Sequence, residues 1–180
     1  MASSIGVLVK FNLFIQAYVP MDFDRIPELV ETYNHNINSG LFDKVYLVSD
    51  ADVSSIYKES DIVKNIIIKK ARNFNTIFRI INMCTGEKDI NVFANSDIKF
   101  DETIKLASRM KNYEAYALTR YDIYEDSDEH QLKPGMKCSQ DTWIFKGKIK
   151  PINANFNVGF LGCDNKLAYE IAKAGYKLSN

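Results

Sequence analysis

Blocks of apolar and polar residues follow one another along the chain and predict alternating strands and helices. Continuous apolar runs predict strands at residues 6–17, 45–49, 62–68, 89–95 and 113–119, with a further short strand in TWIFKG. Apolar residues spaced three and four apart predict helices at 24–39, 73–85, 102–111 and 164–174. Strands that are apolar on both faces and are separated by helices are typical of buried parallel sheets. The pattern therefore predicts one α/β domain over residues 1–180, with a mixed, mostly parallel sheet and helices on both faces.

Short polar residues and glycines mark the ends of several predicted helices. Gly40 ends the first helix, and Asp101 caps the third. At the last helix, Asp164 is the expected N-cap and Gly175 the expected stop. In the strand TWIFKG, the side chain of Trp143 is expected to pack in the core, and stacking on a sugar is the alternative.

Composition excludes several classes of protein. The chain has 23 Lys and Arg residues against 23 Asp and Glu residues, so it lacks the basic surface that a nucleic-acid partner needs. Cys84, Cys138 and Cys163 are far apart and the chain has 2 histidines, which supports neither a disulfide framework nor a zinc cluster. This cysteine usage indicates a reducing compartment such as the cytoplasm. Lys10 interrupts an N-terminal apolar run that is too short to cross a bilayer, so no membrane span is expected.

A polar tripeptide, Asn95-Ser96-Asp97, ends and follows the predicted strand at 89–95. Parallel sheets bind ligands at the carboxyl ends of their strands. Carboxylate, amide and hydroxyl oxygens are suited to Mg²⁺ or Mn²⁺. A metal bound there would neutralise charge on a departing nucleoside diphosphate. The alternative is a simple turn, since these residue types hydrogen-bond to nearby backbone groups.

Residues 121–141 interrupt the alternation with a long polar stretch. It is acidic at its start and contains the turn signal Pro134-Gly135. Loops of this length inside a compact domain are more often functional than accidental, and the alternative is a surface excursion.

Several ordered stretches of the sequence resemble a family of GT-A type glycosyltransferases. They are ANSDIKFDETI, ALTRYD, SQDTWIFKG and NFNVGFLGCDNKLAYEIAKAGYKLSN. The opening NLFIQAYVP and the stretch ARNFNTIFRIIN are similar to the donor-binding front half of the same proteins, among them domains of chlorella-virus multi-domain proteins that decorate capsid glycans. The resemblance extends over nearly the whole chain and implies a GT-A fold.

In GT-A enzymes an Asp-x-Asp motif after a central strand holds the metal and the donor diphosphate. Here that position reads Asn95-Ser96-Asp97, so the first carboxylate is missing. The resemblance implies Asp97 as the metal ligand, Mn²⁺ or Mg²⁺ as the cofactor, and Asn95 and Ser96 as donor contacts. With a single carboxylate, little metal is expected to bind without nucleotide.

Asp141 and Asp164 are the candidate catalytic residues. The resemblance puts Asp141 near the sugar and acceptor, where a carboxylate can hydrogen-bond donor hydroxyls, support the metal or accept a proton. It implies Asp164 as the base that deprotonates the acceptor hydroxyl. The helix dipole and first-turn amides are expected to lower the pKa of Asp164. The alternatives are a loop carboxylate at Asp141 and a capping role alone at Asp164.

Other polar side chains are expected to contact the donor nucleotide. Arginine suits oxyanions, so Arg25 and Arg72 are candidate phosphate ligands, and the resemblance favours Arg72. Asp50 is a candidate for the base or ribose, Arg120 for the sugar pocket, and Tyr18 for donor binding. For Arg25 and Arg72, the alternative is a solvated arginine on the surface.

Together these features predict a metal-dependent glycosyltransferase. It would transfer a hexose or deoxyhexose from a nucleoside-diphosphate sugar, expected to be a UDP-sugar, to a glycan hydroxyl, for example on a viral capsid glycoprotein in the host cytoplasm. The sequence does not decide whether the transfer inverts or retains the configuration at the anomeric carbon. Two other functions remain: a non-catalytic sugar-nucleotide-binding module, and a nucleotidyltransferase, although NLFIQAYVPMDFDR has no glycine for a phosphate loop. The chain is either complete or a domain excised from a longer protein.

Overall fold

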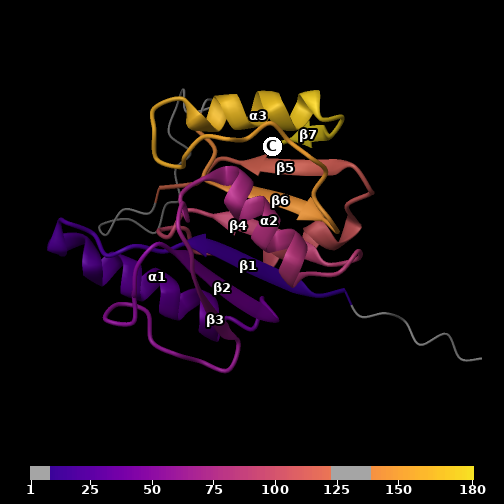
Figure 1. Ribbon diagram of the computed structural model, residues 1–180. Helices are drawn as coiled ribbons and strands as arrows, with labels where there is room; N and C mark the ends of the chain where they lie inside the picture. The colour runs from indigo at the N-terminus through magenta and orange to yellow at the C-terminus, as the bar shows by residue number, and fades with distance from the viewer. Residues whose placement is uncertain (1–8, 123–138) are drawn as a thin grey trace, which may run out of the picture.

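In the computed structural model, which describes residues 9–122 and 139–180, a 7-stranded sheet runs through the protein (Figure 1). The strands are β1 (Phe11–Gln16), β2 (Lys44–Ser49), β3 (Val63–Ile67), β4 (Ile90–Ala94), β5 (Glu114–Leu118), β6 (Thr142–Lys146) and β7 (Lys177–Ser179). The α-helices are α1 (Ile26–Asn38), α2 (Phe74–Cys84) and α3 (Cys163–Lys173), and the 3₁₀ helices are η1 (Phe23–Arg25) and η2 (Glu102–Arg109).

The sheet is mixed and mostly parallel, as predicted. Its strand order is β3-β2-β1-β4-β6-β5-β7. β1 pairs in parallel with β2 and β4, and β2 pairs in parallel with β3. β6 is antiparallel to both β4 and β5, and β5 is parallel to β7. The central strands β1 and β4 therefore end at the same edge of the sheet.

Side chains of the central strands alternate between hydrophobic cores on the two faces of the sheet. In β1, Leu13 and Ile15 belong to the core beneath α1 and η2, whereas Phe14 belongs to the core beneath α2 and α3. Trp143 of β6 is 2% exposed and lies in the second core, which confirms its packing role. The prediction of helices on both faces is confirmed. In the described part of the chain, no helix is long and apolar enough to cross a membrane.

Two strands differ from the prediction in extent or in burial. β1 covers Phe11–Gln16 rather than 6–17, and residues 1–8, like residues 123–138 of the predicted long loop, lie outside the described residues. The apolar run at 62–68 does form a strand, but the prediction that it is buried is wrong. β3 lies at the edge of the sheet, and Ile67 is 60% exposed there because no further strand or helix covers it among the described residues.

η2 is a 3₁₀ helix rather than the predicted α-helix. Its buried side chains, Ile104 and Ala107, lie three residues apart, which is the repeat of a 3₁₀ helix. The predicted cap is present, because the carboxylate of Asp101 accepts the Thr103 N–H at 2.9 Å. The polar face of η2 stays in solvent.

α3 has a different N-cap from the one predicted. Gly162, with φ of 78°, is the N-cap, so Asp164 lies inside the first turn instead of capping it. The predicted stop is confirmed: Gly175 has φ of 86°, and its N–H donates to the carbonyl of Ala172 at 3.0 Å. The chain then enters β7, which is too short to show a periodic pattern in the sequence.

Gly147 follows β6 in a left-handed conformation, with φ of 69°. A Cβ at this position would lie 2.4 Å from the carbonyl oxygen of Glu87, so Gly147→Ala requires the backbone to shift. We expect the free energy of unfolding to fall by roughly 2–4 kcal/mol, through left-handed strain and overpacking. Gly40→Ala is the matched control, because Gly40 has φ of 70° and nothing within 4 Å; it should lose about 1–2 kcal/mol. Urea denaturation measures both, and equal losses would contradict the clash.

Candidate functional site

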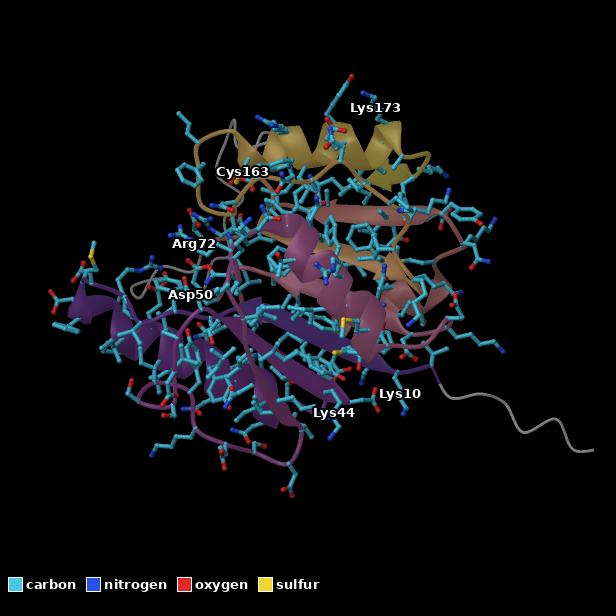
Figure 2. All side chains as sticks on the ribbon, in the orientation of Figure 1. Lys10, Lys44, Asp50, Arg72, Cys163 and Lys173 are labelled. Atoms are coloured by element: carbon cyan, nitrogen blue, oxygen red, sulfur yellow. The ribbon has the colours of Figure 1, made fainter. Side chains whose placement is uncertain are left out.

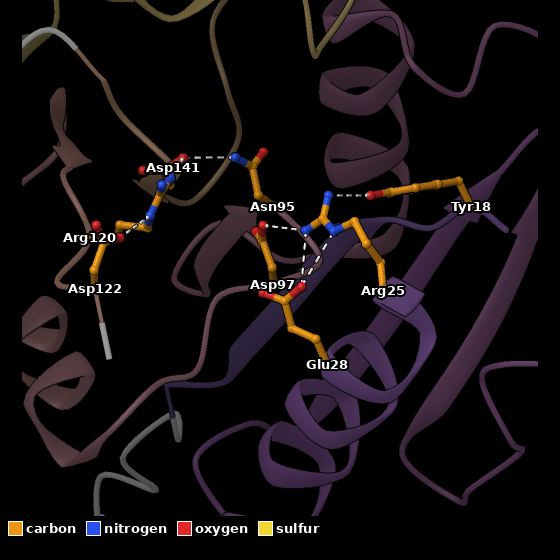
Figure 3. Close-up of polar contacts among 8 residues, drawn as sticks. All are labelled: Tyr18, Arg25, Glu28, Asn95, Asp97, Arg120, Asp122 and Asp141. Atoms are coloured by element: carbon orange, nitrogen blue, oxygen red, sulfur yellow. Dashed lines mark hydrogen bonds and ion pairs between the residues drawn. The ribbon is translucent and has the colours of Figure 1, made fainter. Parts of the chain in front are cut away.

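Many of the residues singled out from the sequence meet at the edge of the sheet where the parallel strands end. Asn95–Asp97 follow β4, and Tyr18 follows β1. Arg120 follows β5, which runs in the same direction. Asp141 precedes β6, and because β6 is antiparallel, its start lies at this edge as well. The fold thus collects polar groups from four separate segments (Figure 3).

Asp97 forms an ion pair with Arg25, which lies on η1. Arg25 Nη2 donates to Asp97 Oδ2 at 3.1 Å, and Arg25 Nη1 donates to the Tyr18 hydroxyl at 3.4 Å. The same guanidinium lies 3.3 Å from Glu28 Oε2. The side chains of Arg25 and Asp97 are 40% and 28% exposed, so a ligand can reach the pair. The connection after β1 therefore brings a positive charge to the carboxylate after β4.

Asp141 is far more buried than Asp97, with 5% of its side chain exposed. Asn95 holds it twice: its Nδ2 donates to Asp141 Oδ1 at 2.9 Å, and its backbone N–H donates to the Asp141 carbonyl at 3.0 Å. Arg120 Nη1 donates to the same Oδ1 at 3.0 Å, and Arg120 Nε donates to Asp122 Oδ1 at 2.9 Å. Burial raises the pKa of Asp141, the Arg120 charge lowers it, and the nearby Asp97 charge raises it again.

One buried oxygen on each of these carboxylates has no hydrogen-bond partner among the described residues: Asp97 Oδ1 and Asp141 Oδ2. An unsatisfied buried acceptor costs about 1–3 kcal/mol, which a bound ligand can offset. Oxygen donors of this kind are the ligands that Mg²⁺ and Mn²⁺ prefer, so these residues fit the metal that the family resemblance implies. The described residues contain no group of three or more His, Cys, Asp or Glu side chains suited to a metal. Substrate phosphate and water would therefore complete the shell.

Asp164 lies in the first turn of α3 and is partly buried. Burial raises its pKa, the charge of Asp141 raises it further, and a hydrogen bond from Cys163 opposes them. Cys163 Sγ lies 3.3 Å from Asp164 Oδ1. The expectation that the helix end lowers this pKa is therefore wrong, because loss of hydration outweighs the favourable helix end. A carboxylate with a raised pKa is a stronger general base.

Asp50 follows β2 and Arg72 precedes α2, and within the described residues no hydrogen bond or ion pair joins either to this cluster. Figure 2 shows both on the same side of the view as Cys163 and away from Lys10 and Lys44. Arg72 Nη2 donates to the carbonyl of Val158 at 3.4 Å, and Asp50 is exposed directly after β2. Both stay predictions for nucleotide contacts.

The cluster also contains polar residues that the sequence pattern did not single out. Glu28 lies one helical turn after Arg25, so its charge spacing was an available signal. Asp122 lies two residues after the arginine that follows β5, outside any helix, and that spacing gives no such signal. Tyr57 has a buried hydroxyl without a hydrogen-bond partner among the described residues, and burial raises the pKa of Tyr57 to about 12. The charges of Asp97 and Arg25 also act on Tyr57, and no local signal relates it to them because the fold brings these segments together.

Because Arg25 pairs with Asp97 Oδ2, a cation that bound to Asp97 would compete with it. We expect Arg25→Gln to strengthen Mn²⁺ binding in the absence of nucleotide, because it removes a like charge and releases Asp97 Oδ2. The expected gain is about two- to fivefold, which corresponds to the modest strength of a partly exposed ion pair. A Mn²⁺ titration followed by electron paramagnetic resonance measures it, and Arg25→Lys, which keeps the charge, is the control. Weaker binding in Arg25→Gln would show that Arg25 does not oppose the metal.

Comparison with known proteins gives similarity in structure only. The sequence matches no protein-family model and no curated protein. The crystal structure of 4-diphosphocytidyl-2C-methyl-D-erythritol synthase from Anaerococcus prevotii is similar with a TM-score of 0.53 and 15% identity, over 95% of this chain and 86% of that chain. The 2-C-methyl-D-erythritol 4-phosphate cytidylyltransferase of Francisella tularensis has a TM-score of 0.48 and 16% identity, over 79% of this chain and 67% of that one.

The first of these similarities establishes the fold alone. That fold is the nucleotide-diphospho-sugar transferase fold, which GT-A enzymes and cytidylyltransferases share. The α/β architecture expected from the sequence is thereby confirmed at the level of the fold.

Proposed function

We propose that this protein is a metal-dependent glycosyltransferase that uses Mn²⁺ or Mg²⁺ and transfers a sugar from a nucleoside-diphosphate sugar to a glycan hydroxyl. The observation that carries the proposal is the pair of carboxylates Asp97 and Asp141, each with an unpartnered oxygen among the described residues. They lie at the edge where sheets of this kind bind ligands. The resemblance to capsid-glycan enzymes makes a UDP-sugar the first donor to test and a viral glycoprotein glycan, in the host cytoplasm, the first acceptor.

The side chains around the carboxylates suit a nucleoside-diphosphate donor. Arg25 and Arg120 are 40% and 34% exposed, and each can turn part of its guanidinium toward a diphosphate. A bound metal would neutralise charge on the leaving diphosphate. Asp164, with its raised pKa, is suited to accept the proton of the attacking hydroxyl. A base in that role is a feature of inverting transfer.

The connection after β1 favours a diphosphate sugar over a nucleoside triphosphate. Loops that wrap a triphosphate rely on glycines and lysines to bring backbone N–H groups and positive charge to the phosphates. Residues 17–22 contain neither glycine nor lysine. The carboxylate of Asp22 accepts the N–H of Asp24 at 3.1 Å, so a donor that a phosphate would need is already used.

A nucleotidyltransferase is the second candidate function. The similarity in fold to a diphosphocytidyl-methylerythritol synthase favours it over a glycosyltransferase. Such an enzyme would attack the α-phosphorus of a nucleoside triphosphate and release pyrophosphate, whereas a glycosyltransferase attacks the anomeric carbon and releases a nucleoside diphosphate. The products therefore distinguish the two functions.

The test is a substrate screen with two readouts. The chain is incubated with a set of nucleoside-diphosphate sugars and glycan acceptors, with Mn²⁺, Mg²⁺ or EDTA, and nucleoside diphosphate is measured. Parallel reactions contain nucleoside triphosphates and sugar phosphates, and pyrophosphate is measured. Metal-stimulated release of nucleoside diphosphate supports the proposal. Release of pyrophosphate supports the second candidate function instead. If neither nucleoside diphosphate nor pyrophosphate is released, both candidate functions are contradicted.

A further inference from the structure

The sequence leaves the metal site one carboxylate short, because Asn95 stands where the Asp-x-Asp motif of GT-A enzymes has its first aspartate. The structure brings another carboxylate to the same place from a distant segment. Asp141 is 46 residues from Asn95 along the chain, yet the Asn95 amide donates to its Oδ1 at 2.9 Å. We propose that Asp141 supplies the second carboxylate of the metal site and that Asn95 positions it. This inference rests on the proposed function for the presence of a metal.

The bonding of Asp141 leaves one oxygen for a ligand. Oδ1 accepts from Asn95 and from Arg120, whereas Oδ2 is buried and has no partner among the described residues. The side chain as a whole is 5% exposed, so water hydrates it poorly. A carboxylate in that position is stabilised by a cation or by a hydrogen-bond donor on a substrate.

The second unpartnered oxygen points to a cation rather than a neutral donor. Asp97 Oδ1 is buried and unpartnered among the described residues as well, and Asp97 lies two residues after Asn95, whose amide bonds to Asp141. Like charges at one site repel unless a positive charge lies between them. Arg25 and Arg120 bind Asp97 Oδ2 and Asp141 Oδ1, which leaves the opposite oxygens for an ion.

This arrangement gives Asn95 a definite role. Its side-chain N–H and its backbone N–H both bond to Asp141, which fixes that residue beside the loop that carries Asp97. An aspartate at position 95 would place a third negative charge against Asp141 and would lose the amide donor. Asn95 is therefore the hydrogen-bond partner of Asp141, a carboxylate from outside the motif. The site then has two carboxylates although the motif itself has one.

The test is Mn²⁺ binding by the chain of residues 1–180 with saturating UDP, followed by the loss of the free-ion signal in electron paramagnetic resonance. Asp141→Asn keeps the shape and the acceptor for Asn95, and is expected to weaken Mn²⁺ binding by about tenfold or more, as does Asp97→Asn. Asp61→Asn is the matched control, because Asp61 is exposed and precedes β3 at the opposite edge of the sheet, and its Mn²⁺ affinity should stay within about twofold of the unsubstituted chain. Unchanged Mn²⁺ affinity in Asp141→Asn overturns the inference, including the case where only sugar-nucleotide binding weakens.

A double variant keeps the inference testable if Asp141→Asn folds poorly. Asn95→Asp combined with Asp141→Asn exchanges the amide and the carboxylate, and is expected to recover most of the lost Mn²⁺ affinity. No recovery in a folded double variant contradicts the pairing. Nucleoside-diphosphate release on the same samples separates this inference from the proposed function. Metal-stimulated release together with a Mn²⁺ affinity that does not depend on Asp141 keeps the proposed function and removes this inference. A Mn²⁺ affinity that depends on Asp141 without any nucleoside-diphosphate release keeps the inference and removes the proposed function.

Discussion

Replacing Asp97 with asparagine is expected to lower the rate of nucleoside-diphosphate release by about a thousandfold at saturating Mn²⁺. A metal that neutralises a leaving group contributes several kcal/mol to transition-state stabilisation, and each factor of ten corresponds to about 1.4 kcal/mol. Asp97 follows β4 directly, and its Oδ1 is one of the unpartnered buried oxygens of the described residues. The asparagine keeps the shape of the side chain but removes the charge that attracts the ion. Steady-state release assays with and without Mn²⁺ measure the effect.

Asp61→Asn is the matched control for this substitution. Asp61 is exposed and precedes β3, at the edge of the sheet opposite the carboxylate cluster, so its charge contributes nothing to the site. The turnover of the Asp61→Asn variant should equal that of the unsubstituted chain. If Asp97→Asn keeps full metal-stimulated turnover, the assignment of Asp97 as a metal ligand is wrong, although a glycosyltransferase activity would still stand.

Asp164→Asn is expected to lower kcat by roughly a hundredfold to ten-thousandfold while donor KM changes little, because general-base catalysis contributes on that scale. The unsubstituted chain should lose activity on the acid side at a pH above the ordinary pKa of aspartate, since burial raises the pKa of Asp164. The variant has no such group, so this acid limb should disappear. The pH dependence of kcat/KM for both proteins, with donor and acceptor present, measures it. An unchanged acid limb in the variant would assign the titration to another residue.

The stability of the same variant separates catalysis from folding. A carboxyl group whose pKa is raised by folding stabilises the native state most below its ordinary pKa, and that contribution is lost as pH rises through the raised value. Asparagine removes the charge that burial disfavours near neutral pH. The variant is therefore expected to be at least as stable as the unsubstituted chain at pH 7. A large drop in Tm would mean that its lost activity reflects unfolding, and Asp164 would then lose its role as the base.

Much of the fold was predictable because it depends on local patterns. The continuous apolar runs at β1, β2 and β4 reflect strands buried on both faces, and the end of α3 carries the glycine signal of its C-terminal cap at Gly175. The errors have physical causes. Burial of β3 depends on its place at the edge of the sheet, and strand order is a property of the whole fold. Asp164 and Gly162 both suit a helix start, and only the backbone conformation distinguishes them.

The candidate site was predictable one segment at a time. Asp97 follows a buried strand, and that position alone directs attention to it. The bond between Asn95 and Asp141 could not be derived, because it joins segments whose approach depends on the antiparallel pairing of β6 with β4. The raised pKa of Asp164 was missed for a related reason: loss of hydration depends on packing, which outweighs the helix end seen in the sequence.

The most direct test of the central claim is a single reaction whose nucleotide and pyrophosphate products are separated by anion-exchange chromatography. The chain, Mn²⁺ and a glycan acceptor are mixed with a UDP-sugar and a nucleoside triphosphate together. A glycosyltransferase with the site described here produces UDP, leaves the triphosphate intact, and stops when EDTA is added. Appearance of pyrophosphate with the UDP-sugar untouched would contradict the account and would make the protein a nucleotidyltransferase.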